Sequence, residues 1–197
     1  MNKIKLLALF GESGSGKDTI QHWLANNIPN THKIVSCTTR PPREYEKDGV
    51  DYYFLTANDF ISKYLKNEIL DFTIFNDWHY GTLKSDLKDD KINIGIFNIE
   101  SIHDLLRYSN GIEILPVYIQ VDEKTRLLRT LKRENSPNCE EICRRFLADK
   151  KDFKNINFDY EIFLNDKDGD SYYGFLKRPK VEQFLKGQIW LIYIKKI

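Results

Sequence analysis

The sequence lacks the features that mark several classes of protein. Its 197 residues include only three cysteines, Cys37, Cys139 and Cys143, and this small odd number argues against a disulfide scaffold and favours a reducing compartment. Neither sign of charge is in excess, since 30 Lys and Arg residues oppose 29 Asp and Glu residues. The resulting net charge of +1 gives no support for a nucleic-acid or membrane partner.

Long apolar runs are missing as well. The apolar run over residues 4–10 is short and ends at a glycine, unlike a signal peptide, and the run over 189–194 is too short to span a bilayer. We therefore expect a cytoplasmic protein. With 41% hydrophobic and 30% charged residues, the chain is long enough for one compact domain with a core of its own.

Strand and helix patterns alternate along most of the chain, which indicates βαβ units and an α/β fold with a parallel sheet. Expected strands cover 4–10, 33–37, 92–99, 112–121 and 159–164, with a further edge strand over 189–194. Expected helices cover 19–27, 101–108 and 123–153, the last interrupted over 135–138 by Pro137. In residues 38–87, aromatic and turn-forming residues alternate, which predicts a small, mixed, mostly β insertion with a helix over 58–65.

The strongest local signal is a glycine-rich loop between the first strand and the first helix. It matches the pattern G-x-x-x-x-G-K and consists of Gly11, Glu12, Ser13, Gly14, Ser15, Gly16 and Lys17. Such a loop turns backbone N–H groups toward phosphate oxygens, and the helix N-terminus adds partial positive charge. The pattern predicts ATP binding, with Lys17 at the β- and γ-phosphates.

Asp18 stands where this pattern usually has Ser or Thr, and Thr19 follows it. Two roles fit Asp18: its carboxylate ligates Mg²⁺, directly or through water, or its charge favours the start of the helix. The predicted ATP-binding residues are Gly11, Ser13, Gly14, Ser15, Gly16, Lys17, Asp18 and Thr19.

A second group of residues begins at Ser36 and includes Arg40 and Arg43, with prolines between the two arginines. Two guanidinium groups in a stiff turn suit the grip of a phosphate, although a basic surface turn explains them equally well. Here the sequence resembles guanylate kinases, which have S-x-T-T-R-x-P-R followed by G-x-D-Y-x-F after the phosphate loop. The resemblance covers about residues 4–166.

This resemblance implies a nucleoside monophosphate kinase fold in three regions. A five-stranded parallel sheet flanked by helices binds ATP (residues 1–37, 88–123 and 155–197), a small mixed β region binds GMP (38–87), and two helices form a lid (124–154). The implied acceptor-site residues are Ser36, Arg40, Arg43, Tyr52, Asp71, Tyr80, Thr82 and Glu100. Asp71, which would accept hydrogen bonds from guanine, is one CH₂ shorter than the family's usual Glu, and Asn98 is neutral where the family is charged.

The resemblance also implies lid arginines, because transfer between two anions needs bridging cations. Arg133 takes one such role, and Arg144 and Arg145 compete for another, with Arg145 preferred. Arg126 and Arg129 are expected to be ordinary residues of a solvated helix face. Asn165 would lie near the adenine of ATP. The residues implied in catalysis are Lys17, Arg40, Arg133, Arg145 and Arg144.

The function implied is transfer of the γ-phosphoryl of ATP, with Mg²⁺, to GMP or dGMP. The partners are then small-molecule nucleotides, and the oligomeric state stays open. A kinase for another or modified deoxynucleotide is the nearest alternative. A guanylate-kinase-like module that binds protein without catalysis is another, disfavoured by Gly16 and Lys17. An unrelated ATPase or GTPase gives Arg40 and Arg43 no role.

Overall fold

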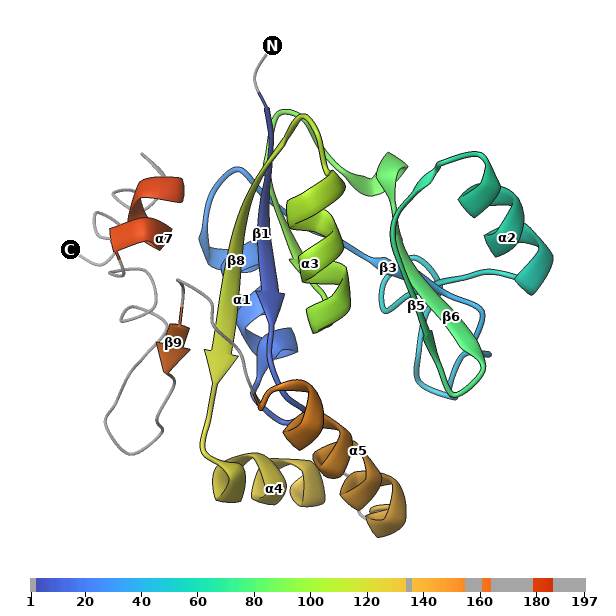
Figure 1. Cartoon of the computed structure of the whole chain (residues 1–197), viewed down its shortest axis with the longest axis vertical. Helices are drawn as coiled ribbons and strands as arrows, with labels where there is room; N and C mark the ends of the chain where they lie inside the picture. The colour runs from blue at the N-terminus through green and yellow to red at the C-terminus, as the bar shows by residue number, and fades with distance from the viewer. Residues whose placement is uncertain (1–2, 134–135, 155–160, 164–178, 186–197) are drawn as a thin grey trace. The chain divides into compact units, whose positions relative to one another are not determined.

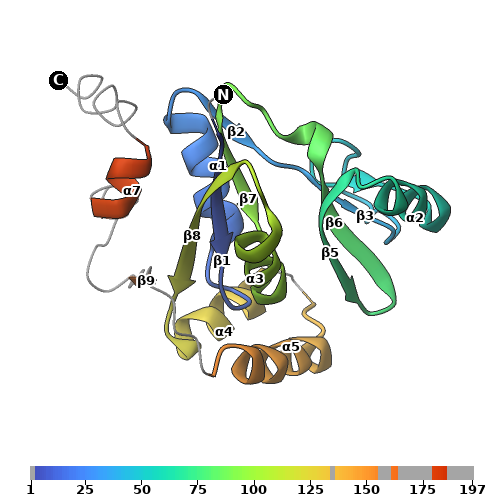
Figure 2. The ribbon, with the colours of Figure 1, turned by 45° about the horizontal axis from the view of Figure 1, so that its top comes forward.

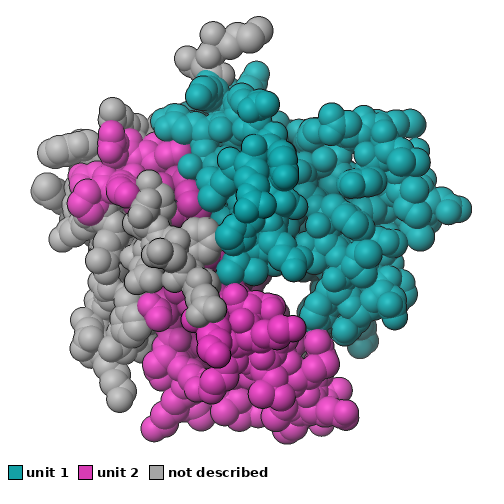
Figure 3. Space-filling model, in the orientation of Figure 1, with its two compact units in different colours: residues 1–8, 30–114 teal, residues 9–29, 115–197 magenta. Residues whose placement is uncertain are grey.

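The structure is a computed structural model that describes residues 3–133, 136–154, 161–163 and 179–185. The chain divides into two compact units (Figure 3). Unit 1 is formed by residues 1–8 and 30–114, and unit 2 by residues 9–29 and 115–197. Of the three boundaries between the units, one falls inside β1 (Ile4–Phe10), one between residues 29 and 30, and one inside β8 (Ile112–Gln120).

A five-stranded sheet has the strand order β2-β7-β1-β8-β9 (Figure 2). Its other strands are β2 (Thr31–Lys33), β7 (Ile92–Ile96) and β9 (Glu161–Phe163). Strand β2 pairs in parallel with β7, and β8 pairs in parallel with β9. The predicted α/β fold with a parallel five-stranded sheet is confirmed.

Strand β1 is apolar because it is buried on both faces. Residues 6–10 have 0% of their surface exposed, as a central strand covered by helices requires. The neighbouring β7 carries one buried polar residue, Asn93, which is 0% exposed. Its side-chain amide donates to the carbonyls of Lys5 and Lys88, and its side-chain oxygen accepts from the Lys88 N–H, so burial leaves no unmet polar group there.

A second sheet, of four strands, lies within unit 1 and has the order β4-β3-β6-β5. Its strands are β3 (Ser36–Thr38), β4 (Tyr53–Phe54), β5 (Ile69–Phe75) and β6 (Trp78–Leu83). Strands β3 and β4 are parallel, whereas β6 is antiparallel to both β3 and β5, so the expected mixed β region is present. The expected strand over 33–37 is wrong as one element, because β2 ends at Lys33 and β3 begins at Ser36.

Strands β5 and β6 form a hairpin, visible in both ribbon views (Figures 1 and 2). Its turn residues, Asn76 and Asp77, have φ of 48° and 62°, as a two-residue turn of the type that follows strand twist requires. Helix α2 (Ala57–Leu65) packs on this sheet through Phe60, which is 1% exposed and shares a core with Cys37, Ile69 and Leu83.

The remaining described elements of unit 1 are helix α3 (Ile99–Tyr108) and the short 3₁₀ helix η1 (Lys84–Asp86). Helix α3 begins earlier than expected, since the Asn98 side chain caps it by accepting from the Ser101 N–H. Helix α3 contacts β5 and therefore reaches the second sheet.

Unit 2 contains α1 (Lys17–Asn27), α4 (Glu123–Lys132), α5 (Cys139–Asp152) and α7 (Pro179–Phe184). The expected break in the long helical stretch is confirmed, because α4 ends before residue 133 and α5 begins after Asn138, whose side chain caps it. Helix α7 was not expected, and the edge strand predicted over 189–194 lies outside the described residues. Across the described ranges, no helix is long and apolar enough to cross a membrane.

Candidate functional site

The phosphate loop, residues 11–17, connects β1 to α1 in unit 2. Gly14 and Gly16 have φ of 77° and 89°, which only glycine adopts without strain, and Gly16 directly precedes the first helical residue. A Cβ on Gly14 would lie 2.6 Å from the carbonyl oxygen of Arg126, so the loop has no room for a side chain there. The predicted loop therefore has both the conformation and the helix N-terminus that phosphate binding needs.

Lys17 points back into this loop. Its Nζ donates to the carbonyl oxygens of Gly11 (2.6 Å) and Glu12 (2.9 Å) and lies 3.5 Å from Ser15 Oγ. Burial lowers the pKa of Lys17, and nearby carboxylates, led by Asp18, offset part of that effect. The ammonium is thus held inside the loop by oxygen atoms of the loop itself.

Asp18 and Thr19 lie in the exposed first turn of α1, immediately after Lys17. Within the described ranges, no group of three or more His, Cys, Asp or Glu side chains is arranged to hold a metal ion. A metal ion at Asp18 would therefore have at most two such side-chain ligands within these ranges. This fits Mg²⁺, which commonly uses one or two carboxylates together with water and substrate phosphates. Both roles predicted for Asp18 remain compatible with its position.

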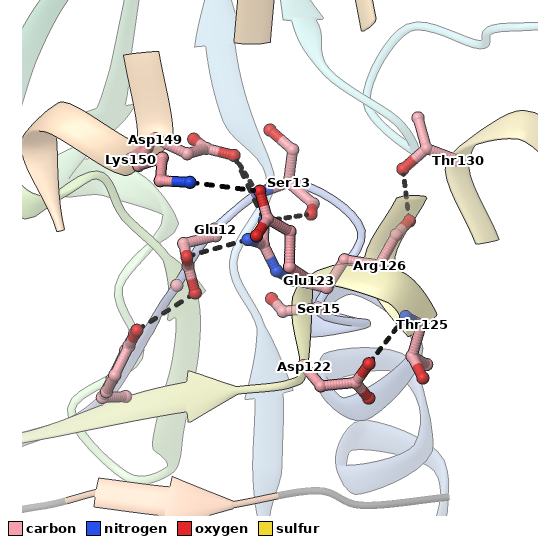
Figure 4. Close-up of polar contacts among 12 residues, drawn as sticks. Glu12, Ser13, Ser15, Asp122, Glu123, Thr125, Arg126, Thr130, Asp149 and Lys150 are labelled. Atoms are coloured by element: carbon pink, nitrogen blue, oxygen red, sulfur yellow. Dashed lines mark hydrogen bonds and ion pairs between the residues drawn. The ribbon is translucent and has the colours of Figure 1, made fainter. Parts of the chain in front are cut away.

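Arg126 corrects one expectation directly. Its side chain is not on a solvated face: it is 5% exposed and forms an ion pair with Glu12 at 3.0 Å (Figure 4). It also lies 3.7 Å from an Asp149 carboxylate oxygen. Arg129, half-buried, also approaches the loop, since its Nη1 is 3.7 Å from where a Cβ on Gly16 would lie. Helical spacing alone gave no sign of these contacts, which depend on how α4 packs on the loop.

The predicted lid arginines lie on α4 and α5. Arg133 follows the last residue of α4 and is exposed. Arg144 donates to Glu141 from Nε (2.7 Å) and Nη2 (2.9 Å), and Arg145 Nε donates to the same carboxylate at 2.7 Å. Hydrogen bonds from Arg144 and then Arg145 lower the pKa of Glu141 to about 2. One carboxylate thus holds both candidates, and the choice between them stays open. Asn165 lies outside the described residues.

In unit 1, Arg40 and Arg43 are gathered around a carboxylate that the sequence reading missed. Arg40 Nη2 contacts both oxygens of Glu46, at 2.8 and 2.9 Å, and the Arg43 backbone N–H donates to Glu46 at 2.8 Å. Burial alone would lower the pKa of Arg40, but the hydrogen bond and charge of Glu46 outweigh it and raise that pKa. The sequence could have indicated this contact, because Glu46 is an acid only three residues after Arg43.

Aromatic side chains complete this phosphate cluster, which we define as Arg40, Arg43, Glu46, Tyr52 and Tyr80. The Arg40 guanidinium carbon lies 5.5 Å from the Tyr52 ring centre, and the Tyr52 and Tyr80 rings meet edge to face at 6.2 Å. A hydrogen bond that Arg40 donates to the Tyr80 hydroxyl oxygen also contributes to the raised pKa of Arg40. The structure therefore brings together four residues predicted from separate stretches of the sequence.

A second group, the base cluster, consists of Ser36, Asp71, Thr82 and Ser101. Ser36 pairs with Thr82 across β3 and β6, and Asp71 lies at an irregularity in the β5–β6 register between Ile69 and Phe72. Thr82 and Tyr80 are two residues apart on β6 and face the same side of the sheet. The base cluster and the phosphate cluster therefore share one face of β6.

Asp71 is the only charged member of the base cluster. Its Oδ2 accepts a hydrogen bond from Ser101 Oγ at 2.9 Å, while its Oδ1 is buried and has no partner among the described residues. Burial raises the pKa of Asp71, and the neighbouring polar groups of Thr82 and Ser101 partly oppose that rise. A buried carboxylate oxygen without a donor is costly unless a ligand supplies one.

Asn98 has a structural role in place of the acid expected from the resemblance. Its Oδ1 caps α3, and its amide donates to Thr73 Oγ1, which lies 3.4 Å from Ser101 Oγ. Through Ser101, this chain of contacts reaches Asp71. Glu100, the other predicted acid at this strand end, is exposed in the first turn of α3.

Comparisons of the sequence and the fold with known proteins identify guanylate kinases as relatives of this chain. A sequence model of the family described as guanylate kinase matches residues 3–179. The guanylate kinase of Helicobacter pylori strain 26695 is 33% identical over 172 residues, covering 84% of this chain and 82% of the relative. That of Malacoplasma penetrans is 34% identical over 173 residues, covering 83% and 86%. The crystal structure of guanylate kinase from Anaplasma phagocytophilum shares the fold, with a TM-score of 0.60 at 19% identity over 95% of this chain and 88% of that chain.

Proposed function

Because the chain belongs to the guanylate kinase family, we propose that it transfers the γ-phosphoryl group of ATP to GMP or dGMP, forming ADP and GDP or dGDP. The observation that carries the choice of base is the buried Asp71 Oδ1 with no donor among the described residues. Guanine presents N1–H and N2–H₂ donors on one edge, whereas adenine presents an acceptor at N1. Sites built to bond a substrate group discriminate strongly against analogues that lack it.

The phosphate cluster supports binding of the acceptor's phosphate. Arg40 and Arg43 supply guanidinium donors, and the hydroxyl groups of Tyr52 and Tyr80 add two more. Glu46 sets the position of Arg40 before the substrate arrives. Its charge reduces the net charge of the two arginines from +2 to +1, which still favours an anionic phosphate.

The phosphate loop supports binding of ATP. Backbone N–H groups of the loop and the Lys17 ammonium would contact the phosphates. Asp18 would hold Mg²⁺, which neutralises charge on the phosphate oxygens when it is bound. Asn165, near adenine, completes the proposed ATP site.

Catalysis in this proposal comes from positioning and from charge. The nucleophile is a phosphate oxygen of the acceptor, so the proton chemistry is minor and the main need is to stabilise negative charge during transfer. Lys17, Arg40, Arg133 and one of Arg144 or Arg145 would supply the cations. Exclusion of water by the lid would prevent loss of the phosphoryl group by hydrolysis.

The regional assignments belong to the same proposal. Residues 38–87 would bind the acceptor, residues 124–154 would form the lid, and the remaining segments would bind ATP. We propose the cytoplasm as the location, since the reaction consumes ATP and the three cysteines form no disulfide within the described residues.

A second candidate is a kinase for another or modified deoxynucleotide. It is favoured by the Ser101 contact, because one oxygen of the already short Asp71 is engaged and only the other lacks a donor. A nucleotide that offers a single donor to Asp71 would satisfy this arrangement.

A coupled assay of ADP release tests the proposal, with ATP, Mg²⁺ and GMP, dGMP, AMP, dTMP, dCMP or dUMP. Turnover restricted to GMP and dGMP is expected, with Lys17→Ala as the inactive control. Turnover restricted to a different nucleotide would overturn the base assignment. A lack of turnover with every nucleotide would contradict GMP and dGMP as acceptors and favour a modified nucleotide or a protein-binding module.

A further inference from the structure

The backbone of Ser13, inside the phosphate loop, is hydrogen-bonded to two side chains from helices that are far away in the sequence (Figure 4). Its carbonyl oxygen accepts from Arg126 Nη1 on α4 at 3.2 Å, and its N–H donates to Asp149 Oδ2 on α5 at 2.7 Å. A loop that binds phosphate through its own backbone depends on the orientation of each peptide. Both polar groups of this residue are therefore fixed from outside the loop.

The residues that do this form a buried ionic network, which we define as Glu12, Arg126 and Asp149. Arg126 bridges the two acids, at 3.0 Å from Glu12 and 3.7 Å from Asp149, and its guanidinium lies 4.8 Å from the Phe146 ring centre. The Tyr118 hydroxyl donates to the other oxygen of Glu12 at 3.1 Å. Side-chain exposures of 6%, 14% and 16% for Arg126, Glu12 and Asp149 show that the arginine is buried and that the two acids are largely covered.

A gain in folding stability does not by itself explain why charged side chains occupy these positions. Removing charges from water carries a large desolvation cost, and well-packed apolar residues are often at least as stabilising in the same place. What an ionic network provides and apolar packing does not is a fixed geometry for the peptide groups that it bonds. That geometry is useful here because the bonded peptide belongs to the phosphate loop.

The α4 backbone adds a steric constraint to the same loop. A Cβ on Gly14 would lie 2.6 Å from Arg126 O and 2.7 Å from Thr130 Oγ1, and that hydroxyl itself donates to Arg126 O at 2.8 Å. The turn of α4 that carries Arg126 therefore lies against the residue after Ser13. Asp149 is one turn of α5 beyond Arg145, so the network also joins the helix of the predicted lid arginines to the loop.

We propose that Arg126 and Asp149 are positioning residues for ATP: they hold the phosphate loop in its binding conformation and couple the two lid helices to it. This inference rests on the proposed function for the identity of the nucleotide. It predicts that loss of the network weakens ATP binding and leaves binding of the acceptor nearly unchanged, because the acceptor clusters belong to different elements.

The main test uses the full chain with the network replaced by neutral groups. The variant Glu12→Gln/Arg126→Leu/Asp149→Ala removes the two acids together with the cation between them and keeps an acceptor for Tyr118. We expect the Kd of a fluorescent ATP analogue and the KM for ATP to rise at least tenfold, with the KM for GMP within twofold. A matched control, Glu123→Gln/Lys150→Gln, breaks an exposed α4–α5 ion pair that does not touch the loop, and ATP affinity should stay within twofold.

Two single variants of Asp149 distinguish the effect of its hydrogen bond to Ser13 from the effect of its charge. They also replace the main test if the triple variant does not fold. Asp149→Asn keeps an acceptor for the Ser13 N–H and should retain ATP affinity within about threefold, whereas Asp149→Ala should lose tenfold. ATP affinity within twofold of the wild type in folded triple and Asp149→Ala variants would overturn the proposal. If GMP proved not to be the acceptor, the analogue titration would still decide, so this failure is distinguishable from that of the proposed function.

Discussion

The phosphate loop and the acceptor clusters are built in opposite ways. The loop is seven consecutive residues, and its ligand groups are largely backbone N–H groups whose directions are set by glycines at positive φ. The phosphate and base clusters are side chains from β3, β5, β6, α3 and the segment over 40–52, and tertiary packing alone brings them together. The proposed phosphate ligands of the first region are therefore consecutive in sequence, whereas the proposed acceptor ligands of the second come from several separate elements.

This difference predicts where single substitutions act. In the loop, the proposed ligands are mostly backbone groups, so the side chains that matter are Lys17, which contacts phosphate, and Glu12, which belongs to the ionic network. In the clusters, each side chain is itself a ligand or the support of one. Four substitutions, in order of expected effect, test the contrast.

Lys17→Ala should have the largest effect, because it removes the only side-chain cation of the phosphate loop. We expect kcat to fall by about a thousandfold or more, since charge on the transferred group loses a direct partner. The coupled assay measures this, with circular dichroism to show that the variant is folded. Lys63→Ala, in the exposed Lys63–Glu68 pair, is the control for loss of a lysine, and a fall of less than tenfold for Lys17→Ala would contradict the assigned role.

Arg40→Ala should act on the acceptor alone. We expect the KM for GMP to rise by about a hundredfold, because a charged hydrogen-bonding partner of the phosphate is lost and Glu46 is left unpaired. The KM for ATP should stay within about threefold. Glu46→Gln, which removes the support and keeps the ligand, should have a smaller effect in the same direction. Equal changes in both KM values would break the comparison between the two regions.

Asp71→Asn tests selectivity and pH dependence together. We expect kcat/KM for GMP to fall by about fiftyfold, because the carboxylate acceptor for guanine is replaced by an amide. In the wild type, burial raises the pKa of Asp71, so kcat/KM for GMP should decline as the pH falls through a value above the usual carboxyl range. The variant should lose this acidic limb. A wild-type profile without the limb would contradict the account.

The same shift has a consequence for stability, with a definite sign. Because the pKa of Asp71 is higher in the folded chain than in the unfolded chain, folding favours the protonated form. The contribution of this group is present at low pH and is lost as the pH rises through the folded pKa. In the absence of nucleotide, Asp71→Asn should therefore raise the Tm at pH 7 more than at pH 4.

Ser101→Ala should have the smallest effect of the four. We expect the KM for GMP to rise about fivefold, since Asp71 loses the donor that orients it but keeps its charge. The acidic limb of the pH profile should move to higher pH, because that hydrogen bond holds the pKa of Asp71 down. An unchanged pH profile would show that Ser101 only fills space.

The same contrast explains how much could be predicted from the sequence. The parallel sheet, the phosphate loop and the break between α4 and α5 could be predicted because each depends on neighbouring residues. Apolar runs indicate the strands, glycines indicate the loop, and Pro137 indicates the break, just before Asn138, which caps α5. The resemblance to guanylate kinases then indicated Arg40, Asp71 and Thr82, although no local pattern sets their positions.

The supporting residues could not be read in this way. Ser101 is 30 residues from Asp71, and Asp149 is 136 residues from Ser13, so neither contact leaves a periodic trace. Arg126 was misread for the same reason, since a charged residue on a helix is usually solvated and only the packing of α4 shows otherwise. The contact of Glu46 with Arg40 and Arg43 was the easiest of these to predict, because the three residues lie close together in the sequence.

The most direct test of the central claim is the ratio of kcat/KM for GMP to that for AMP, measured for the wild type and for Asp71→Asn. The account predicts a ratio above about one hundred in the wild type, which falls toward one in the variant because the carboxylate that accepts from guanine is gone. A wild type without preference for GMP, or a variant that keeps the full preference, would contradict it.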